Sequence, residues 1–218
     1  MEREMFLSRV ATAVAASRLP SPPPVPAELP DMASTDLVRL FRERAVMVDT
    51  VVHGPVTRHG VPRLVGGIAS GHGCDSFVAW EHLPAPGISA ALSANGLTHV
   101  DHEIPPGGGR EDQMLAYGEV SLGITGSIGG LAESGSVVLD HAQGQPRLAS
   151  LVPETHVVLL EIGTIERTLA HWAARHPDLA AGSANLVIVS GPSRTGDIEQ
   201  ILNLGVHGPR HLHVVLIE

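Results

Sequence analysis

The sequence contains very little cysteine, few aromatic residues and no excess of basic charge. Cys74 is the single cysteine among 218 residues, so this chain alone forms no internal disulfide and holds no iron–sulfur cluster. Aromatic residues make up 3% of the chain, and its formal net charge is −9. Nucleic-acid-binding proteins usually present a basic face and stacking rings, so these values argue against that class.

Long apolar runs are also missing from the N-terminus. Residues 1–20 carry Glu2 and Glu4 and contain no unbroken apolar segment, which is untypical of a signal peptide or a membrane span. A lone thiol is typical of a reducing compartment. We therefore expect a cytoplasmic protein with no membrane span.

The first part of the chain predicts a helix followed by a linker. Apolar residues recur at near-helical spacing over residues 5–19, and the overlapping segment LPSPPPVPAELP is rich enough in proline to be extended. A second helical pattern covers residues 36–48. We expect residues 1–33 to form an N-terminal helix and proline-rich linker, and residues 34–218 to form one domain.

Short apolar runs then alternate with helical patterns. The runs expected to be strands are residues 76–80, 97–100, 121–126, 136–140, 155–161, 185–190 and 211–217. Several are continuous β-branched runs, as strands covered on both faces require. Helices are expected over residues 86–96, within 164–177, and from Thr195 to Leu204. This alternation predicts a three-layer, doubly wound α/β fold with a mostly parallel sheet.

Ligands of such sheets bind beyond the carboxyl ends of the strands, and the first turn of interest there is GITGSIGGLAESGS. Its glycines permit close approach of a ligand, and Glu133 is its only ionised side chain. A carboxylate among small residues suits a nucleophile or a general base. The alternative is a water-exposed Glu133 at a helix C-terminus that Gly135 caps.

The second turn, SGPSRTGDIEQ, follows an apolar run. Thr195 is a good N-cap, and a helix beginning there offers free amides to an anion while Arg194 adds a bidentate clamp. Asp197 and Glu199 already complement the helix dipole and would repel a phosphate. A carboxylate, a hydroxyl group and an internal ion pair therefore remain open as partners of Arg194.

The third turn, NLGVHGPRH, places His207 and Arg210 before the last apolar run. His207 has the chemistry to exchange protons near neutral pH, or it bonds to backbone. Two short patterns, His99-Val100-Asp101-His102 and His211-Leu212-His213, come closest to a metal site. His211 and His213 share one face of a strand, but no third ligand is indicated for them. We expect no metal site.

Three stretches together resemble the lactate-utilization protein C family, the stand-alone LUD domain. They are SGPSRTGDIEQILNLGVHGPRHLHVVLI, GITGSIGGLAESGSVVL and RLASLVPETHVVLL, which lie between residue 122 and the C-terminus. Gly196 departs from the family's usual alanine, Asn203 replaces an apolar residue, and AESGS replaces the commoner Ala-Glu-Thr-Gly-Thr.

The resemblance implies a fold similar to the phosphosugar isomerase and CoA-transferase superfamily. It also implies a role in oxidising L-lactate to pyruvate alongside two partner proteins with iron–sulfur clusters, while this chain carries no cofactor. The leading hypothesis is an accessory subunit that holds a small carboxylate. The candidate ligand-binding residues are Thr125, Gly126, Gly135, Ser193, Arg194, Thr195, Asp197 and Arg210.

Two other functions stay open. In CoA transferases of the similar fold, a glutamate before a small residue and a glycine attacks the acyl-CoA thioester, and Glu133-Ser134-Gly135 looks like that arrangement. Glu133 and His207 are accordingly the candidate catalytic residues. The third hypothesis is an interaction module that binds iron–sulfur partner proteins and no small ligand.

Overall fold

A computed structural model describes residues 3–16, 32–101, 109, 111, 115, 117–142, 144–179, 183, 185–196 and 202–218. The chain divides into two compact units, Met1–Pro30 and Asp31–Glu218. In the first unit, helix α1 spans Arg3–Ala16, and the predicted linker after it lies outside the described residues. In the part of the chain described, no helix has the length and apolar character needed to cross a membrane.

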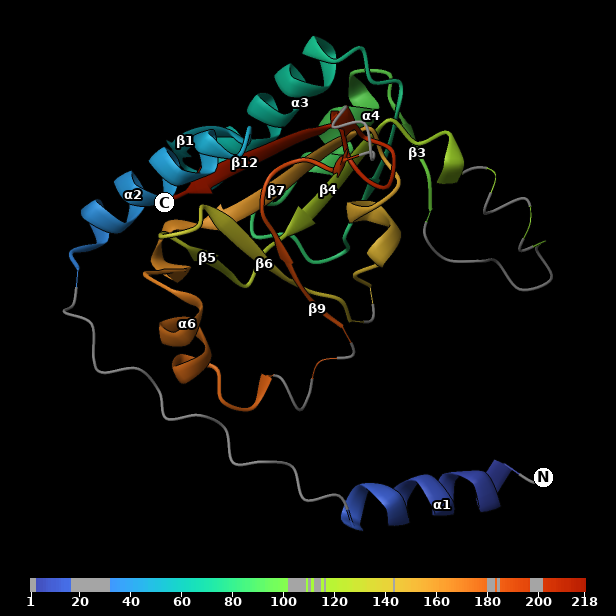
Figure 1. Ribbon diagram of the computed structural model, residues 1–218. Coiled ribbons are helices and arrows are strands. Elements are labelled where there is room, and N and C mark those ends of the chain that lie inside the picture. Colours follow the sequence, from blue (N-terminus) through green and yellow to red (C-terminus); the bar gives the residue numbers. More distant parts are fainter. Residues whose placement is uncertain are drawn as a thin grey trace. The chain divides into compact units, whose positions relative to one another are not determined.

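The second unit is built on a six-stranded parallel sheet with the order β1-β12-β7-β4-β2-β3 (Figure 1). Its strands are β1 (Val51–Val56), β12 (His211–Ile217), β7 (Thr155–Glu161), β4 (Leu122–Gly126), β2 (Ser76–Ala79) and β3 (Thr98–His99). The continuous apolar strands β7 and β12 lie inside the sheet, where both faces are covered. The predicted α/β fold with a mostly parallel sheet is confirmed.

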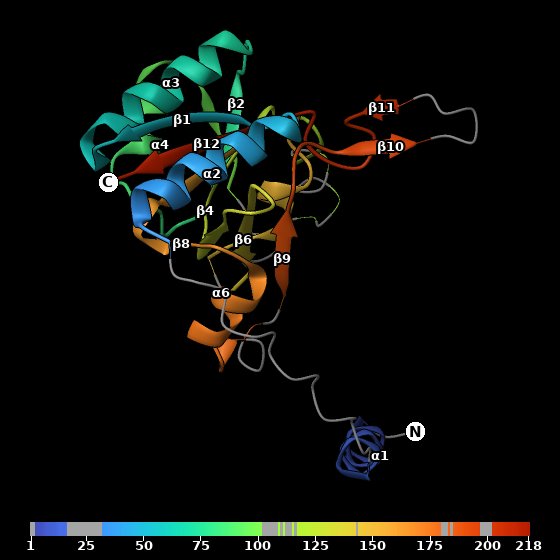
Figure 2. The ribbon, with the colours of Figure 1, turned by 60° about the vertical axis from the view of Figure 1, so that its left-hand side comes forward.

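The expected strands 136–140 and 185–190 pair in a second sheet instead of the central one. This four-stranded sheet has the order β8-β5-β6-β9, with β6 antiparallel to both of its neighbours. Its strands are β8 (Ile165–Glu166), β5 (Gly129–Leu131), β6 (Ser136–Asp140) and β9 (Leu186–Val189). A separate antiparallel pair joins β10 (Arg194–Gly196) to β11 (Leu202–Leu204) and extends from the body in Figure 2.

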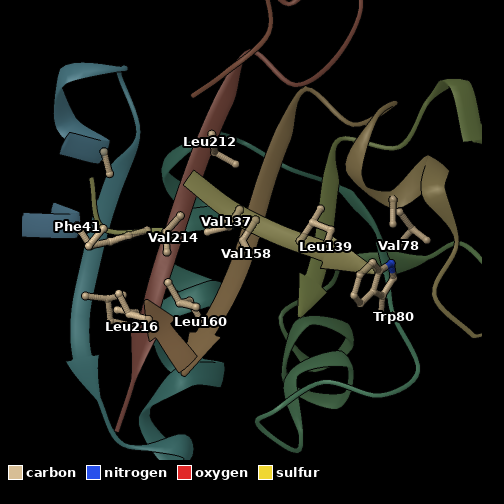
Figure 3. Close-up of a cluster of buried hydrophobic side chains, with 14 of the residues drawn as sticks. Phe41, Val78, Trp80, Val137, Leu139, Val158, Leu160, Leu212, Val214 and Leu216 are labelled. Atoms are coloured by element: carbon tan, nitrogen blue, oxygen red, sulfur yellow. The ribbon is translucent and has the colours of Figure 1, made fainter. Parts of the chain in front are cut away.

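Helices and the second sheet cover the central sheet. The helices are α2 (Ser34–Met47), α3 (Val61–Gly71), α4 (Ile88–Ala94) and α6 (Leu169–Arg175), with short 3-10 turns at Arg58–Gly60, Arg147–Ser150 and Ile162–Thr164. Leu212, Val214 and Leu216 of β12 pack in one cluster with Phe41 of α2 and with strand β6 (Figure 3). Val215 and Ile217 point the opposite way, into the cluster that α3 and α4 close. Both faces of the sheet are therefore buried.

Two helix predictions need correction. The expected helix from Thr195 to Leu204 is wrong, because its two ends are strands that pair Arg194 with Leu204 and Gly196 with Leu202. The helix expected within residues 164–177 is shorter, since Ile165 and Glu166 join the second sheet as β8. Thr168 caps the remaining helix α6 by accepting a hydrogen bond from the His171 amide.

Candidate functional site

The turn that carries Glu133 and the segment that carries Arg194 meet at the C-terminal end of α2. Gly135 packs so closely on α2 that a Cβ atom there would collide with the Ala45 backbone. Gly191 approaches the Val48 carbonyl in the same way. Two of the turns selected from the sequence therefore lie against one structural element.

A chain of serine hydroxyls links the two turns. Ser136 Oγ lies 2.6 Å from Ser190 Oγ and donates to Ser134 Oγ at 2.8 Å. Ser136 is buried, and a hydroxyl without partners there would be costly. These bonds fix residue 190, just before the Gly-Pro-Ser-Arg stretch, against the turn that contains Glu133.

Arg194 forms an ion pair with Asp49, which follows the last turn of α2. Asp49 adopts a φ of 60°, and the Asp49 and Thr50 amides bond back to α2 carbonyls, so this residue also terminates the helix. The Ser193 amide donates to the Pro209 carbonyl at 2.8 Å. Because Arg194–Gly196 form strand β10, the described residues do not form the helix N-terminus that was expected at Thr195 to supply free amides to an anion. Of the open alternatives for Arg194, the structure contains the internal ion pair.

The other residues of that predicted site are placed as follows. Thr195 belongs to β10, and Asp197 lies outside the described residues. Arg210 is exposed and lies 3.8 Å from a Glu154 carboxylate oxygen, while His207 is exposed in the loop before β12. Ser193 also accepts a hydrogen bond from the Gly205 amide, which holds this loop beside Arg194.

Glu133 lies in the turn between β5 and β6, and the helix C-terminus offered as the alternative is not formed there. Gly135 does adopt the left-handed conformation, with φ 66°. The Glu133 carboxylate accepts a hydrogen bond from Arg167 Nε at 2.8 Å, and its side chain is 44% exposed. The Glu133 carboxylate is therefore partly open to solvent and is paired with the Arg167 guanidinium.

Thr125 lies in the core at the centre of the sheet. It is fully buried, and its hydroxyl lies 2.9 Å from His156 Nε2. Burial, together with a smaller effect of His141, lowers the pKa of His156 to about 3, so this ring stays neutral at physiological pH. Gly126, one residue later, ends β4 beside Trp80 and Pro84.

A second polar cluster brings together histidines that sequence reasoning left apart. His213 Nδ1 lies 2.9 Å from His53 Nε2, and His213 Nε2 lies 2.9 Å from His72 Nε2. The His211 ring packs on His72 with a centroid separation of 4.5 Å. A cavity of about 540 Å³ opens beside these rings, between α3 and the edge of the sheet.

The hydrogen bonds of this histidine cluster join its own rings to one another. Burial lowers the pKa of His213 to about 4, and the neighbouring histidines contribute to the same direction. Both ring nitrogens of His213 face other rings, and no group of three ligands in the described part of the chain is arranged for a metal ion. The sequence indicated this histidine cluster only through His211 and His213, which share one face of a strand.

Cys74 has no feature of a reactive nucleophile. Its side chain is half buried, and burial raises the pKa of its thiol. A thiolate is the nucleophilic form, so this shift lowers its reactivity at neutral pH.

Comparison with known proteins identifies first a structure with the same fold and then the family of this chain. The crystal structure of a DUF162 family protein from Deinococcus radiodurans shares the fold, with a TM-score of 0.64 and 20% identity over 86% of this chain and all of that chain. The LUD domain family model matches residues 57–217. The chain belongs to the LUD domain family.

Several relatives carry the functional name lactate utilization protein C. The lactate utilization protein C of Deinococcus radiodurans is 26% identical over 97% of this chain and 93% of its own length. The lactate utilization protein C 1 of Bacillus mycoides is 32% identical over 63% of this chain and 60% of its own length.

Proposed function

We propose that this chain acts in the oxidation of L-lactate to pyruvate as an accessory subunit of a cytoplasmic system. The observation that carries the proposal is the similarity, over 97% of the chain, to a relative named lactate utilization protein C. Oxidation of a hydroxy acid releases two electrons, and a chain with one cysteine has no iron–sulfur cluster of its own to receive them. The proposal therefore assigns the clusters to partner proteins.

Within this role, Arg194 is the candidate anchor for the carboxylate of lactate or pyruvate. Its side chain is 37% exposed, and its present partner Asp49 is more exposed still. Surface ion pairs contribute about 0–1 kcal/mol, so a carboxylate ligand replaces Asp49 at little cost. The guanidinium binds a carboxylate in a bidentate manner, which a lysine does not do.

The test is lactate-dependent electron transfer by the assembled system with Arg194→Ala in place of the normal chain. A weaker lactate affinity is expected, with Arg39→Ala as the matched control because Arg39 also forms exposed carboxylate pairs, to Asp36 and Glu43. Wild-type rates and affinity in the Arg194 variant would exclude the site. Failure of the chain to co-purify with any iron–sulfur protein from lactate-grown cells would exclude the subunit role.

The exposed carboxylate of Glu133 supports acyl transfer as a second candidate function. In that reaction the carboxylate attacks the carbonyl carbon of an acyl-CoA thioester, the carbon–sulfur bond breaks, CoA leaves as a thiolate, and an acyl-glutamyl anhydride remains on the protein. Mass spectrometry after incubation with acetyl-CoA and succinyl-CoA detects such an adduct. An unmodified Glu133 with both donors, together with flat titrations for lactate and pyruvate, leaves the role of an interaction module.

A further inference from the structure

The cavity beside the histidine cluster has the features of a small-molecule site. Its walls are α3 and the neighbouring strands β1 and β12, which lie together at one edge of the central sheet (Figure 1). A volume of about 540 Å³ is in the usual range for ligand pockets. On the α3 wall, a Cβ atom at Gly67 or Gly71 would meet no atom within 4 Å. The helix therefore leaves space where most sequences would place side chains.

The histidines supply hydrogen-bond donors to this space. His53, His213 and His72 form a chain with two ring-to-ring bonds, and each bond uses one N–H group. Three imidazole rings carry at least three N–H groups, so at least one remains at an end of the chain. The rings of His53 and His72 make no other hydrogen bond to the described residues.

The charges around the cavity favour an anion. Arg63 lies on the cavity wall and has no carboxylate partner in the described part of the chain. Arg42 of α2 reaches the Val52 and Gly54 carbonyls of β1, and its charge acts on His53. At His211, the charge of Glu154 raises the pKa of the ring and the charge of Arg210 lowers it. The nearby charged groups therefore carry a net positive charge.

We propose that this cavity binds an organic acid larger than a three-carbon acid. Its carboxylate bonds to Arg63 and to the free N–H end of the histidine chain. Its apolar body lies along Leu64, Ile68 and the space over Gly67, which are also on the cavity wall. The site includes neither Arg194 nor Glu133, so it goes beyond the carboxylate site considered above and does not depend on it.

The experiment is calorimetric titration of the full chain with 3-phenylpropionate, and with 4-phenyl-2-butanone as its neutral counterpart. Saturable binding of the acid and at least tenfold weaker binding of the ketone are expected. Arg63→Ala removes the cation and Gly67→Leu fills the cavity, and each substitution is expected to lower the affinity for the acid at least tenfold. Gly163→Leu is the matched control, because a side chain there also enters open space but does not line the cavity.

Proton uptake provides a second readout. A bound carboxylate stabilises the protonated form of a neighbouring imidazole, so titrations at pH 7 in buffers of different ionisation enthalpy are expected to show net proton uptake. Unchanged affinity for the acid in a chain that carries both His53→Phe and His72→Phe would remove the histidine chain from the site and overturn the proposed contact.

Other outcomes separate this proposal from the proposed function. Absence of binding at millimolar 3-phenylpropionate overturns the cavity site and leaves the lactate role untouched. Equal affinity for the acid and the ketone overturns the choice of an anion. Binding lost in Arg194→Ala but retained in Arg63→Ala and Gly67→Leu places the acid at the Asp49 ion pair, which overturns this proposal and supports the other site.

Discussion

Protonation of buried His156 is expected to make the fold sensitive to mild acid. The ring is fully buried on β7, and its only hydrogen bond among the described residues is to Thr125. Its pKa falls from the ordinary 6.5 to about 3 in the folded protein, chiefly through burial. The unfolded chain therefore takes up the proton first, and stability that is fully present above pH 6.5 is lost as the pH falls toward 3.

The magnitude follows from the interval between the unfolded pKa and the working pH. At pH 5 the interval below 6.5 is about 1.5 pH units, which corresponds to about 2 kcal/mol of unfolding free energy at about 1.4 kcal/mol per unit. A loss of that size is a substantial part of the stability of an ordinary domain, about 5–15 kcal/mol.

Urea unfolding of the full chain at pH 8, 7, 6 and 5 measures the effect. His156→Gln keeps a polar group near Thr125 and removes the titration, so its loss between pH 7 and pH 5 should be smaller than that of the unmodified chain by about 2 kcal/mol. Buried His213 also titrates, but it is present in both proteins and cancels in the difference. His207 is exposed, so the variant His207→Gln should retain the full pH dependence of the unfolding free energy. Equal losses in His156→Gln and the unmodified chain would refute this reasoning.

Three further outcomes follow from particular contacts. Asp49→Asn frees Arg194 and should raise its affinity for lactate while changing the unfolding free energy by less than about 1 kcal/mol, and weaker lactate binding would contradict this. Gly123→Ala should destabilise the chain by at least about 2 kcal/mol in urea unfolding, because the new Cβ collides with the Ala149 carbonyl. Gly67→Ala should instead stabilise it by about 0.5–1 kcal/mol, because the helix gains alanine's propensity without a clash.

Some elements of the fold were readable from the chain because their patterns are local. Strands β7 and β12 are continuous apolar runs, and such runs predict strands buried on both faces. Strand β1 was missed because His53, Gly54 and Pro55 interrupt its apolar character. Helix α3 was missed because of its three glycines, yet Val61, Val65 and Ile68 bury one face of it.

The segment after Arg194 shows where local patterns fail. Ile198, Ile201 and Leu202 have helical spacing, and Thr195 is a good N-cap, so the sequence favoured a helix. The structure pairs Arg194 with Leu204 in an antiparallel ladder, and such pairing depends on tertiary context as well as on propensity. For this reason the helix N-terminus predicted at the candidate anion site was wrong. The ligand role of Arg194 stays a prediction.

The sequence by itself determined the fold class, the lack of a cluster-binding cysteine set, and the common face of His211 and His213, since each depends on composition or short spacing. Only the tertiary structure decided the partners of the reactive side chains. Asp49 lies 145 positions from Arg194, while His53 and His72 lie 160 and 141 positions from His213. The central sheet places β1 beside β12, from opposite ends of the domain, and no local pattern encodes that neighbourhood.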